Sequence, residues 1–360
     1  MRHYNLTTMD MNTHSHGNGT ATATTGTSTL GIITEYSLNW PGSVKGSTHE
    51  LAINDKFIFV TGQNMHQVAK FDYNGNILAY FNMPDKSGPH GILFDKQGRL
   101  WVSLEFFGLV VRLDDNGHIV EEIDVQLYAK GAKTPINTAP HGIGLDVDGE
   151  TIWFTGKRTS TIGRINPDKS VEHFQLNTLA ALPIYLSAGP DGGIWGTELY
   201  GSSILNISKQ GVVKEYSIPT TNSRPIAVIP DPTGKYMWFS EEAGVKIGKI
   251  DMAGHITEYA VPALQKNDIV ASLSFDRENN IWVQVYVDLN NPVPAGDDYI
   301  IKIDKVIHNE GVTSLSGIPS TTHTIPSRNS MMHRIRMDYD GNLWFTEMMT
   351  DKLGKITINK

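Results

Sequence analysis

The sequence of 360 residues contains no cysteine, which excludes disulfides, thiolate zinc sites and cysteine nucleophiles. It has no cluster of lysine and arginine either, and its formal net charge is −8 at pH 7. Because phosphate groups and anionic membranes are bound by clustered basic side chains, we expect neither nucleic acid nor a membrane as a partner. No stretch approaches the roughly 18 apolar residues of a membrane-spanning helix, and no signal peptide is recognisable. The chain is therefore predicted to be soluble, with the cytoplasm as its default compartment.

Long periodic helices are also missing, and a short aromatic motif recurs instead from one end of the chain to the other. Its last copy is G-N-L-W-F-T-E-M-M-T-D-K-L-G-K-I at residues 341–356. The aromatic anchors recur about every 42 residues, with two longer intervals, at Phe59, Trp101, Trp153, Trp195, Trp238, Trp282 and Trp344. A repeat of this length made of short strands is typical of a β-propeller. We therefore predict an all-β domain over residues 29–360 with seven four-stranded antiparallel blades.

The N-terminal region is predicted to close this ring. Residues 1–28 are rich in Thr, Gly, Ser and Asn and lack periodicity, so we expect a disordered arm in which His3, His14 and His16 are linker residues. Residues 31–37 repeat the sequence of residues 254–260, which form the outermost strand of another repeat. The last repeat lacks that strand, so the N-terminal strand is expected to complete the last blade and cover its edge.

Three insertions interrupt the repeat. Residues 127–138 and 289–298 lengthen loops on the face where the inner strands begin, where loops commonly shape a pocket. Residues 306–318 are expected on the opposite face, with no function that the sequence indicates.

A histidine begins the inner strand in four of the seven repeats. The residues at this position are His49, His90, His141, Ile184, Ile226, Ala271 and His333. Because blade seven adjoins blade one in a closed ring, the four histidines belong to one contiguous sector and should converge at the channel mouth. The other sector is apolar, and a mouth of this mixed character is typical of a small-molecule site.

Carboxylates are expected on the same face. Glu105, Glu198 and Glu347 lie at or next to the end of the second strand in their repeats, and Glu50 follows His49 directly. Imidazole titrates near neutral pH and is a common metal ligand, so the set suits proton transfer or a bound cation. Two structural alternatives remain. The histidines could simply hydrogen-bond the backbone of a neighbouring blade, and the glutamates could form salt bridges or cap turns.

The motifs P-H-G-I, L-W-F-T-E, I-G-R-I and I-T-E-Y-x-x-P, together with the closing strand, resemble the virginiamycin B lyase (streptogramin lyase) family over about residues 30–360. The resemblance implies a ring-opening elimination in which an imidazole removes a proton α to a carbonyl and a magnesium ion polarises the substrate. It places the catalytic base at His333 and its acidic partner at Glu347.

The chain departs from the family pattern at two positions. An apolar stretch, Val270–Ala271, stands where the family has a histidine in the sixth blade, and Met331 stands where it has a glutamate. We therefore predict a monomeric, metal-assisted lyase for a cyclic or ester-containing natural product other than a streptogramin. Magnesium is favoured, with iron or another transition metal as the alternative. The predicted metal or substrate ligands are His49, His90, His141, Glu50, Glu105 and Glu198.

Two further functions stay open. The first is a multi-histidine metal-dependent hydrolase, such as a lactonase, or an oxygenase. The second is a non-catalytic scaffold that binds a ligand or a protein.

Overall fold

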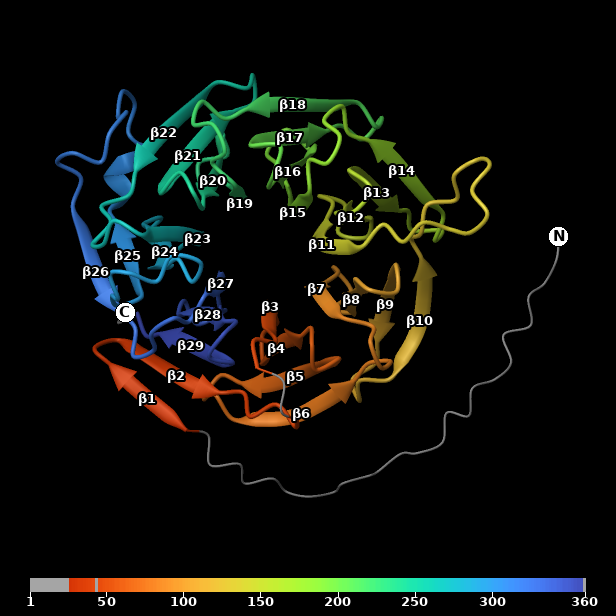
Figure 1. Ribbon diagram of the computed structural model, residues 1–360, viewed down its shortest axis with the longest axis horizontal. Coiled ribbons are helices and arrows are strands. Elements are labelled where there is room, and N and C mark those ends of the chain that lie inside the picture. The colour runs from red at the N-terminus through yellow and green to blue at the C-terminus, as the bar shows by residue number, and fades with distance from the viewer. Residues whose placement is uncertain (1–25, 43–44, 359–360) are drawn as a thin grey trace.

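The computed structural model describes residues 26–42 and 45–358. Their strands form seven sheets around a central axis, which confirms the predicted seven-bladed propeller (Figure 1). In each blade the first strand lies next to the axis and the last lies at the rim. Among the described residues, no helix is long and apolar enough to cross a bilayer.

Six blades consist of four consecutive antiparallel strands each. Blades one to three contain β3 (Thr48–Ile53), β4 (Phe57–Gly62), β5 (Gln67–Asp72), β6 (Ile77–Asn82), β7 (Pro89–Phe94), β8 (Leu100–Leu104), β9 (Leu109–Leu113), β10 (Ile119–Asp124), β11 (Pro140–Leu145), β12 (Ile152–Gly156), β13 (Thr161–Ile165) and β14 (Val171–Gln175). Blades four to six contain β15 (Pro183–Ala188), β16 (Ile194–Glu198), β17 (Ser203–Ile207), β18 (Val213–Ser217), β19 (Pro225–Pro230), β20 (Tyr236–Glu241), β21 (Lys246–Asp251), β22 (Ile256–Ala260), β23 (Asp268–Phe275), β24 (Ile281–Val287), β25 (Tyr299–Ile303) and β26 (Ser320–Thr324).

Blade seven joins the two ends of the chain. Its inner strands are β27 (Met332–Met337), β28 (Leu343–Glu347) and β29 (Lys352–Ile356), and β2 (Ile33–Ser37) pairs antiparallel with β29. The predicted closing strand is thereby confirmed. A further strand, β1 (Thr27–Leu30), pairs with the outer edge of β2, so this blade has five strands where the sequence predicted four. β1 also extends into the range assigned to the N-terminal arm, and residues 1–25 of that arm lie outside the described residues.

The regular spacing of the repeat within the chain reflects one contact, between a turn and a strand, that recurs in six blades. The tryptophan of the second strand is buried and donates its Nε1–H to an aspartate in the preceding turn, as Trp101 does to Asp95 at 2.9 Å and Trp344 to Asp338 at 2.8 Å. The same aspartates accept backbone N–H groups of their own turns. Blade one has Phe59 at this position, which has no such donor. The apolar faces of neighbouring blades pack against each other, so the core is divided into clusters between blades.

The insertion at residues 306–318 lies on the face predicted for it. It begins in the helix η1 (Lys305–His308), whose first residue donates its backbone N–H to Asn280 in the turn between β23 and β24. Ile307 is buried in the core between blades five and six, and Val312 accepts a hydrogen bond from Tyr259 in blade five. The insertion therefore ties two blades together at the end of the channel opposite the histidines.

Candidate functional site

A β-bulge places the histidines at the axis. In β7, Pro89 pairs with Leu104 but Ile92 pairs with Val102, so two residues of the inner strand oppose one residue of its partner. A register shift occurs at the equivalent position of all seven inner strands. Bulges of this kind redirect side chains next to functional sites. The register also places Ala271 at the histidine position of blade six, as the sequence analysis assumed.

The four imidazoles lie together, although up to 284 residues of sequence separate them. The ring centroids of His90 and His141 are 3.6 Å apart, and those of His49 and His90 are 4.9 Å apart. His333 lies 5.2 Å from His49 and 5.8 Å from His90 by the same measure. Closure of the ring thus brings together the histidines of blades seven, one, two and three. We call His49, His90, His141 and His333 the histidine cluster.

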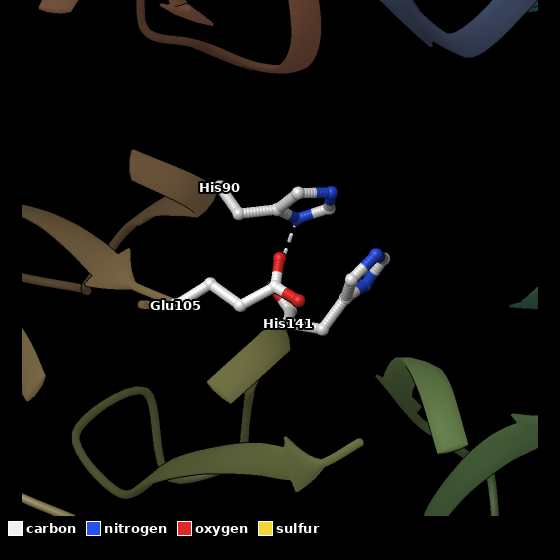
Figure 2. A group of neighbouring side chains, drawn as sticks. All are labelled: His90, Glu105 and His141. Carbon is white, nitrogen blue, oxygen red and sulfur yellow. Dashed lines mark hydrogen bonds between the residues drawn. The ribbon is translucent and has the colours of Figure 1, made fainter. Parts of the chain in front are cut away.

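Hydrogen bonds to backbone carbonyls set the tautomer of three of these imidazoles. Nδ1 of His90 lies 3.0 Å from the carbonyl oxygen of His141 (Figure 2), and Nδ1 of His141 lies 3.1 Å from that of Ile184. Nδ1 of His49 lies 2.8 Å from the carbonyl oxygen of Ser47. A carbonyl only accepts, so each Nδ1 must carry the proton and each Nε2 keeps its lone pair. The blade-to-blade hydrogen bond foreseen as an alternative is therefore present, and it leaves the second nitrogen available for chemistry.

Burial keeps these imidazoles neutral. It lowers the pKa of His49 to about 3, with a further contribution from His333, and it lowers the pKa values of His90 and His141 well below the usual range. The pKa of His333 is also lowered by burial, against an opposing effect of Glu50. Neutral imidazoles are the form that accepts protons and binds metals.

A buried ion pair lies directly beneath the cluster. Arg334 follows His333 and donates through Nε to both carboxylate oxygens of Glu50, at 3.0 and 2.8 Å, and its Nη2 contacts Oε1. The guanidinium also stacks 4.3 Å from the ring centre of Tyr185, on the other side of the channel. Although burial acts in the opposite direction, Arg334 and His333 hold the pKa of Glu50 well below its usual range. Glu50 is therefore ionised, and its Oε1 lies 3.3 Å from Nε2 of His333 without hydrogen-bond geometry.

Glu105 is the carboxylate that reaches the histidine cluster from the end of a second strand. One ligand atom from each of His90, Glu105 and His141 lies within 4.8 Å of the others, and all three residues are buried (Figure 2). Oε2 of Glu105 accepts a hydrogen bond from Gln63 at 2.6 Å, and Oε1 of Glu105 pairs with Lys157 at 3.1 Å. Burial raises the pKa of Glu105, and the nearby Lys157 opposes this effect. The group could bind a metal ion.

Glu347 and Glu198 make different contacts from Glu105, and a shift of one residue explains why. Both are the last residues of their strands, paired with Met332 and Pro183, whereas Glu105 comes one residue after the end of β8. Successive strand residues face opposite sides of a sheet, so one step in sequence redirects the side chain.

Glu347 instead accepts from Thr350 and lies near Glu35, and its pKa is raised to about 8 by burial and by Glu35. Burial and Glu215 raise the pKa of Glu198 likewise to about 8. The contact of Glu347 with Thr350 is of the turn-capping kind named as an alternative, and each of the two glutamates lies near a second carboxyl group in its blade. The catalytic role predicted for Glu347 and the ligand role predicted for Glu198 remain predictions.

Three side chains at the site, Arg334, Lys157 and Gln63, were not predicted from the sequence. A signal for each was present. Arg334 stands at the bulge position that Glu50 has in the adjacent blade one, so an ion pair across the closure was foreseeable once the ring was assumed. Lys157 and Gln63 both directly follow the end of a second strand, as Glu105 does in the blade between them.

Comparison with known proteins finds similarity to the family that the sequence motifs resemble. The sequence model of the Virginiamycin B lyase family matches residues 120–288. A virginiamycin B lyase of Nocardia farcinica (strain IFM 10152) is 29% identical over 214 residues, which cover 49% of this chain and 70% of the relative.

Solved structures of similar fold cover 91% of the chain. A streptogramin B lyase structure has a TM-score of 0.74 at 22% identity, with 97% of that chain covered. Selenomethionine-substituted virginiamycin B lyase from Staphylococcus aureus has a TM-score of 0.73 at 23% identity, with 99% covered. A catalytically inactive variant of the Staphylococcus aureus enzyme, with a histidine replaced by alanine, was solved with quinupristin and has a TM-score of 0.71 at 22% identity, with 99% covered.

The chain is thus a seven-bladed propeller with a histidine-lined channel mouth, and its sequence is similar to that of virginiamycin B lyases at modest identity.

The two positions at which this chain departs from the family pattern offer no ligand to a magnesium ion. Ala271, at the sixth-blade position, is a buried member of the core between blades six and seven. Met331, two residues before His333, packs against the same core. Neither side chain has an oxygen or nitrogen to offer a hard cation such as Mg²⁺.

Proposed function

We propose that this protein is a lyase that opens a cyclic or ester-containing small molecule by β-elimination at the histidine cluster, with His333 as the base. The observation that carries the proposal is the setting of His333. Its side chain is 19% exposed, more than the whole residues His49, His90 and His141, and it faces the ionised carboxylate of Glu50. An accessible imidazole backed by a buried carboxylate is an arrangement suited to general base catalysis.

The proposed step balances without an added reactant. Glu50 favours the tautomer of His333 that is protonated at Nε2, so the lone pair of Nδ1 is free to take a proton from the carbon α to a carbonyl. The electrons of that C–H bond form a double bond to the β carbon, and the C–O bond at the β carbon breaks. The ester leaves as a carboxylate, and the ring opens. Glu50 then stabilises the imidazolium that has formed.

Positive charge near the cluster would stabilise the negative oxygen that develops during this step. Lys157, whose ammonium group pairs with Glu105 beside the cluster at 3.1 Å, is the side chain that would supply this charge. A divalent metal ion bound at the cluster would polarise the carbonyl further. The relative solved with quinupristin supports a small-molecule substrate for this chain as well.

Mass analysis of the products tests the proposal. The purified protein is incubated with a panel of cyclic depsipeptides and lactones, with His333→Ala as the matched inactive variant. Elimination opens the ring without changing the mass, whereas hydrolysis adds one water. A ring-opened product of unchanged mass that disappears with His333→Ala is expected. A product heavier by one water, or equal turnover by His333→Ala, would overturn the assignment.

A metal-dependent hydrolase is the second candidate, and the His90, Glu105 and His141 group favours it. Two histidines and a glutamate form the ligand set of several hydrolytic zinc sites. The same mass measurement separates this candidate from the lyase, because only hydrolysis incorporates water.

A further inference from the structure

We propose that His90, Glu105 and His141 form a binding site for a transition-metal dication of the zinc class, located in blades two and three. This site lies on the opposite side of His333 from blade six, where the family pattern has a further histidine. The proposal goes beyond the lyase assignment, because metal binding can be measured whether or not turnover occurs.

The first support is an unpartnered nitrogen. His90 is completely buried, and its Nε2 has no hydrogen-bond partner among the described residues. Leaving a buried polar atom unpaired costs about 1–3 kcal/mol. The lone pair of this Nε2 is free because Nδ1 donates to the carbonyl of His141. A metal ion is a partner that a lone pair in this position can take.

The second support is the way the ligands are held. Histidine ligands of metal ions usually donate their other ring N–H to a carbonyl or carboxylate, which fixes the ring and its tautomer. His90 and His141 both do this, through the carbonyls of His141 and Ile184 in the next blades. Glu105 is held by Gln63 and Lys157, and Asn137 fixes its backbone by donating to the carbonyl of Glu105 at 3.2 Å. The three donors are thus positioned by groups outside the set.

The donor chemistry selects the class of metal. Zn²⁺ binds imidazole nitrogen and carboxylate oxygen at about 2.0–2.2 Å, whereas Mg²⁺ prefers an octahedron of oxygen ligands. Two imidazoles and one carboxylate suit zinc, iron(II), cobalt(II) or nickel(II), in keeping with the preference of nitrogen ligands for later transition metals. Donor atoms around a tetrahedral Zn²⁺ would lie roughly 3.4 Å apart, so donor atoms that now lie within 4.8 Å of one another would approach by up to about 1.4 Å on binding. Lys157 would then move away from Oε1 of Glu105.

Three protein ligands leave at least one coordination position open. Catalytic zinc sites use such a position for water or a substrate oxygen. Because the ring of His90 lies 5.8 Å from that of His333, a carbonyl oxygen bound there would have its α carbon near the proposed base. The site is therefore placed to serve either the elimination or a hydrolysis.

Calorimetric titration of the full chain, first stripped with a chelator, tests the proposal with ZnCl₂ and MgCl₂ as separate probes. A background variant, His3→Ala with His14→Ala and His16→Ala, removes binding by the N-terminal histidines. We expect one Zn²⁺ per chain in this background and an affinity for Mg²⁺ weaker by about 1,000-fold or more. Equal affinity for the two ions would overturn the proposal.

Glu105→Gln is the decisive variant because it preserves size and hydrogen bonding. We expect it to weaken Zn²⁺ binding by about 100-fold, since outer-shell losses alone typically cost 10–100-fold. Glu241→Gln, at the buried end of β20, is the matched control and should leave the affinity unchanged. Zn²⁺ binding that is unaffected by Glu105→Gln would overturn the site. This outcome does not depend on His90→Asn, a ligand variant that could fail to fold. The two proposals can fail separately. If the unmodified protein turns over no substrate, the lyase assignment is rejected. If His333→Ala still binds Zn²⁺, the metal site stands without it.

Discussion

The channel mouth has two sectors, which share a backbone and differ in side chains. In blades seven, one, two and three the bulge residue is a histidine, and in blades four, five and six it is Ile184, Ile226 or Ala271. A hydroxyl of the second strand donates to the bulge carbonyl of the next blade in both sectors, as Thr61 does to His90 at 2.9 Å and Thr197 to Ile226 at 3.0 Å. The blade contacts therefore do not require histidine at this position.

This difference bears on what the histidines are for. If their purpose were to join blades, the hydroxyl contact would make them redundant, and the apolar sector shows that blades close without them. His90 adds a second bond to the carbonyl of His141, which already accepts from Ser103 at 3.3 Å, and leaves its own buried Nε2 unused by the fold. Four neutral imidazoles in one sector are a cost in folding terms, which favours a functional reason for them.

The strongest way to break this comparison is to remove one side chain from each sector. We expect His333→Ala to reduce turnover of a substrate from the depsipeptide and lactone panel by about 10²–10⁴-fold, because general base catalysis is lost. Ile226→Ala, at the same bulge position in the apolar sector, should reduce it by less than about 10-fold. Steady-state kinetics on both variants gives the ratio. A similar loss of turnover in the two variants would mean that His333 contributes no more to catalysis than Ile226 does.

The buried ion pair beneath the histidines is expected to contribute to stability as well as to the setting of His333. Arg334→Met leaves the Glu50 carboxylate buried and unpaired, so the unfolding free energy should fall by about 3–5 kcal/mol. The double variant with Glu50→Gln should recover part of this loss, because no uncompensated charge remains. Urea denaturation of the two single variants and the double variant measures the coupling. Additive losses would show that the two side chains do not depend on each other.

The hydroxyl contact between blades sharpens the comparison from the structural side. Thr346 accepts from the backbone N–H of Arg334 at 3.1 Å and donates to the carbonyl of His49 at 2.6 Å. Thr346→Val should therefore lower the unfolding free energy by about 1–3 kcal/mol, and Thr197→Val in the apolar sector by about 1 kcal/mol. Thermal and urea unfolding of both variants tests this order. If Thr346→Val leaves the unfolding free energy unchanged, the hydroxyl contact does not stabilise the histidine sector.

The smallest effect is a pH dependence of stability outside the histidine cluster. The pKa of Glu198 is about 8, because of burial and the nearby Glu215, so the folded state keeps a proton that the unfolded chain has lost above its ordinary carboxyl range. Since the folded state then binds more protons, stability decreases as the pH rises from that range through 8.

We expect the unfolding free energy to fall between pH 7 and 8, and to fall by about 1 kcal/mol less in Glu198→Gln. The lowered histidine pKa values act mainly below pH 6.5 and do not obscure this window. Urea midpoints at both pH values decide it. Identical slopes in the two proteins would mean that Glu198 is ionised when folded.

Much of the architecture was predictable because the repeat arises from contacts between residues close together in the sequence. The spacing of Trp101, Trp153 and the other anchors comes from the distance between a turn aspartate and the tryptophan of the next strand, a contact within one hairpin. The closing strand was predictable because residues 31–37 repeat residues 254–260. The added strand β1 was not, since Thr27–Leu30 has no counterpart in the repeat and all but its last residue are small and polar.

The site was only partly predictable, and strand register set the limit. The four histidines share one repeat position, so their meeting followed from the ring alone. Glu105 and Glu347 looked equivalent in sequence, yet one residue of offset directs Glu105 to the imidazoles and Glu347 to Glu35. A pattern with a period of two cannot be read reliably at a strand end, where the strand's last residue is uncertain by one or two.

The sequence by itself determined the number of blades, the closure of the ring and the set of blades that carry histidine, because each is repeated locally. Tertiary structure alone decided which nitrogen of each imidazole is free, which carboxylate joins them and that Arg334 holds Glu50 beneath them. Those features depend on atoms brought together from blades far apart in the chain, at distances of a few ångströms that no repeat spacing encodes.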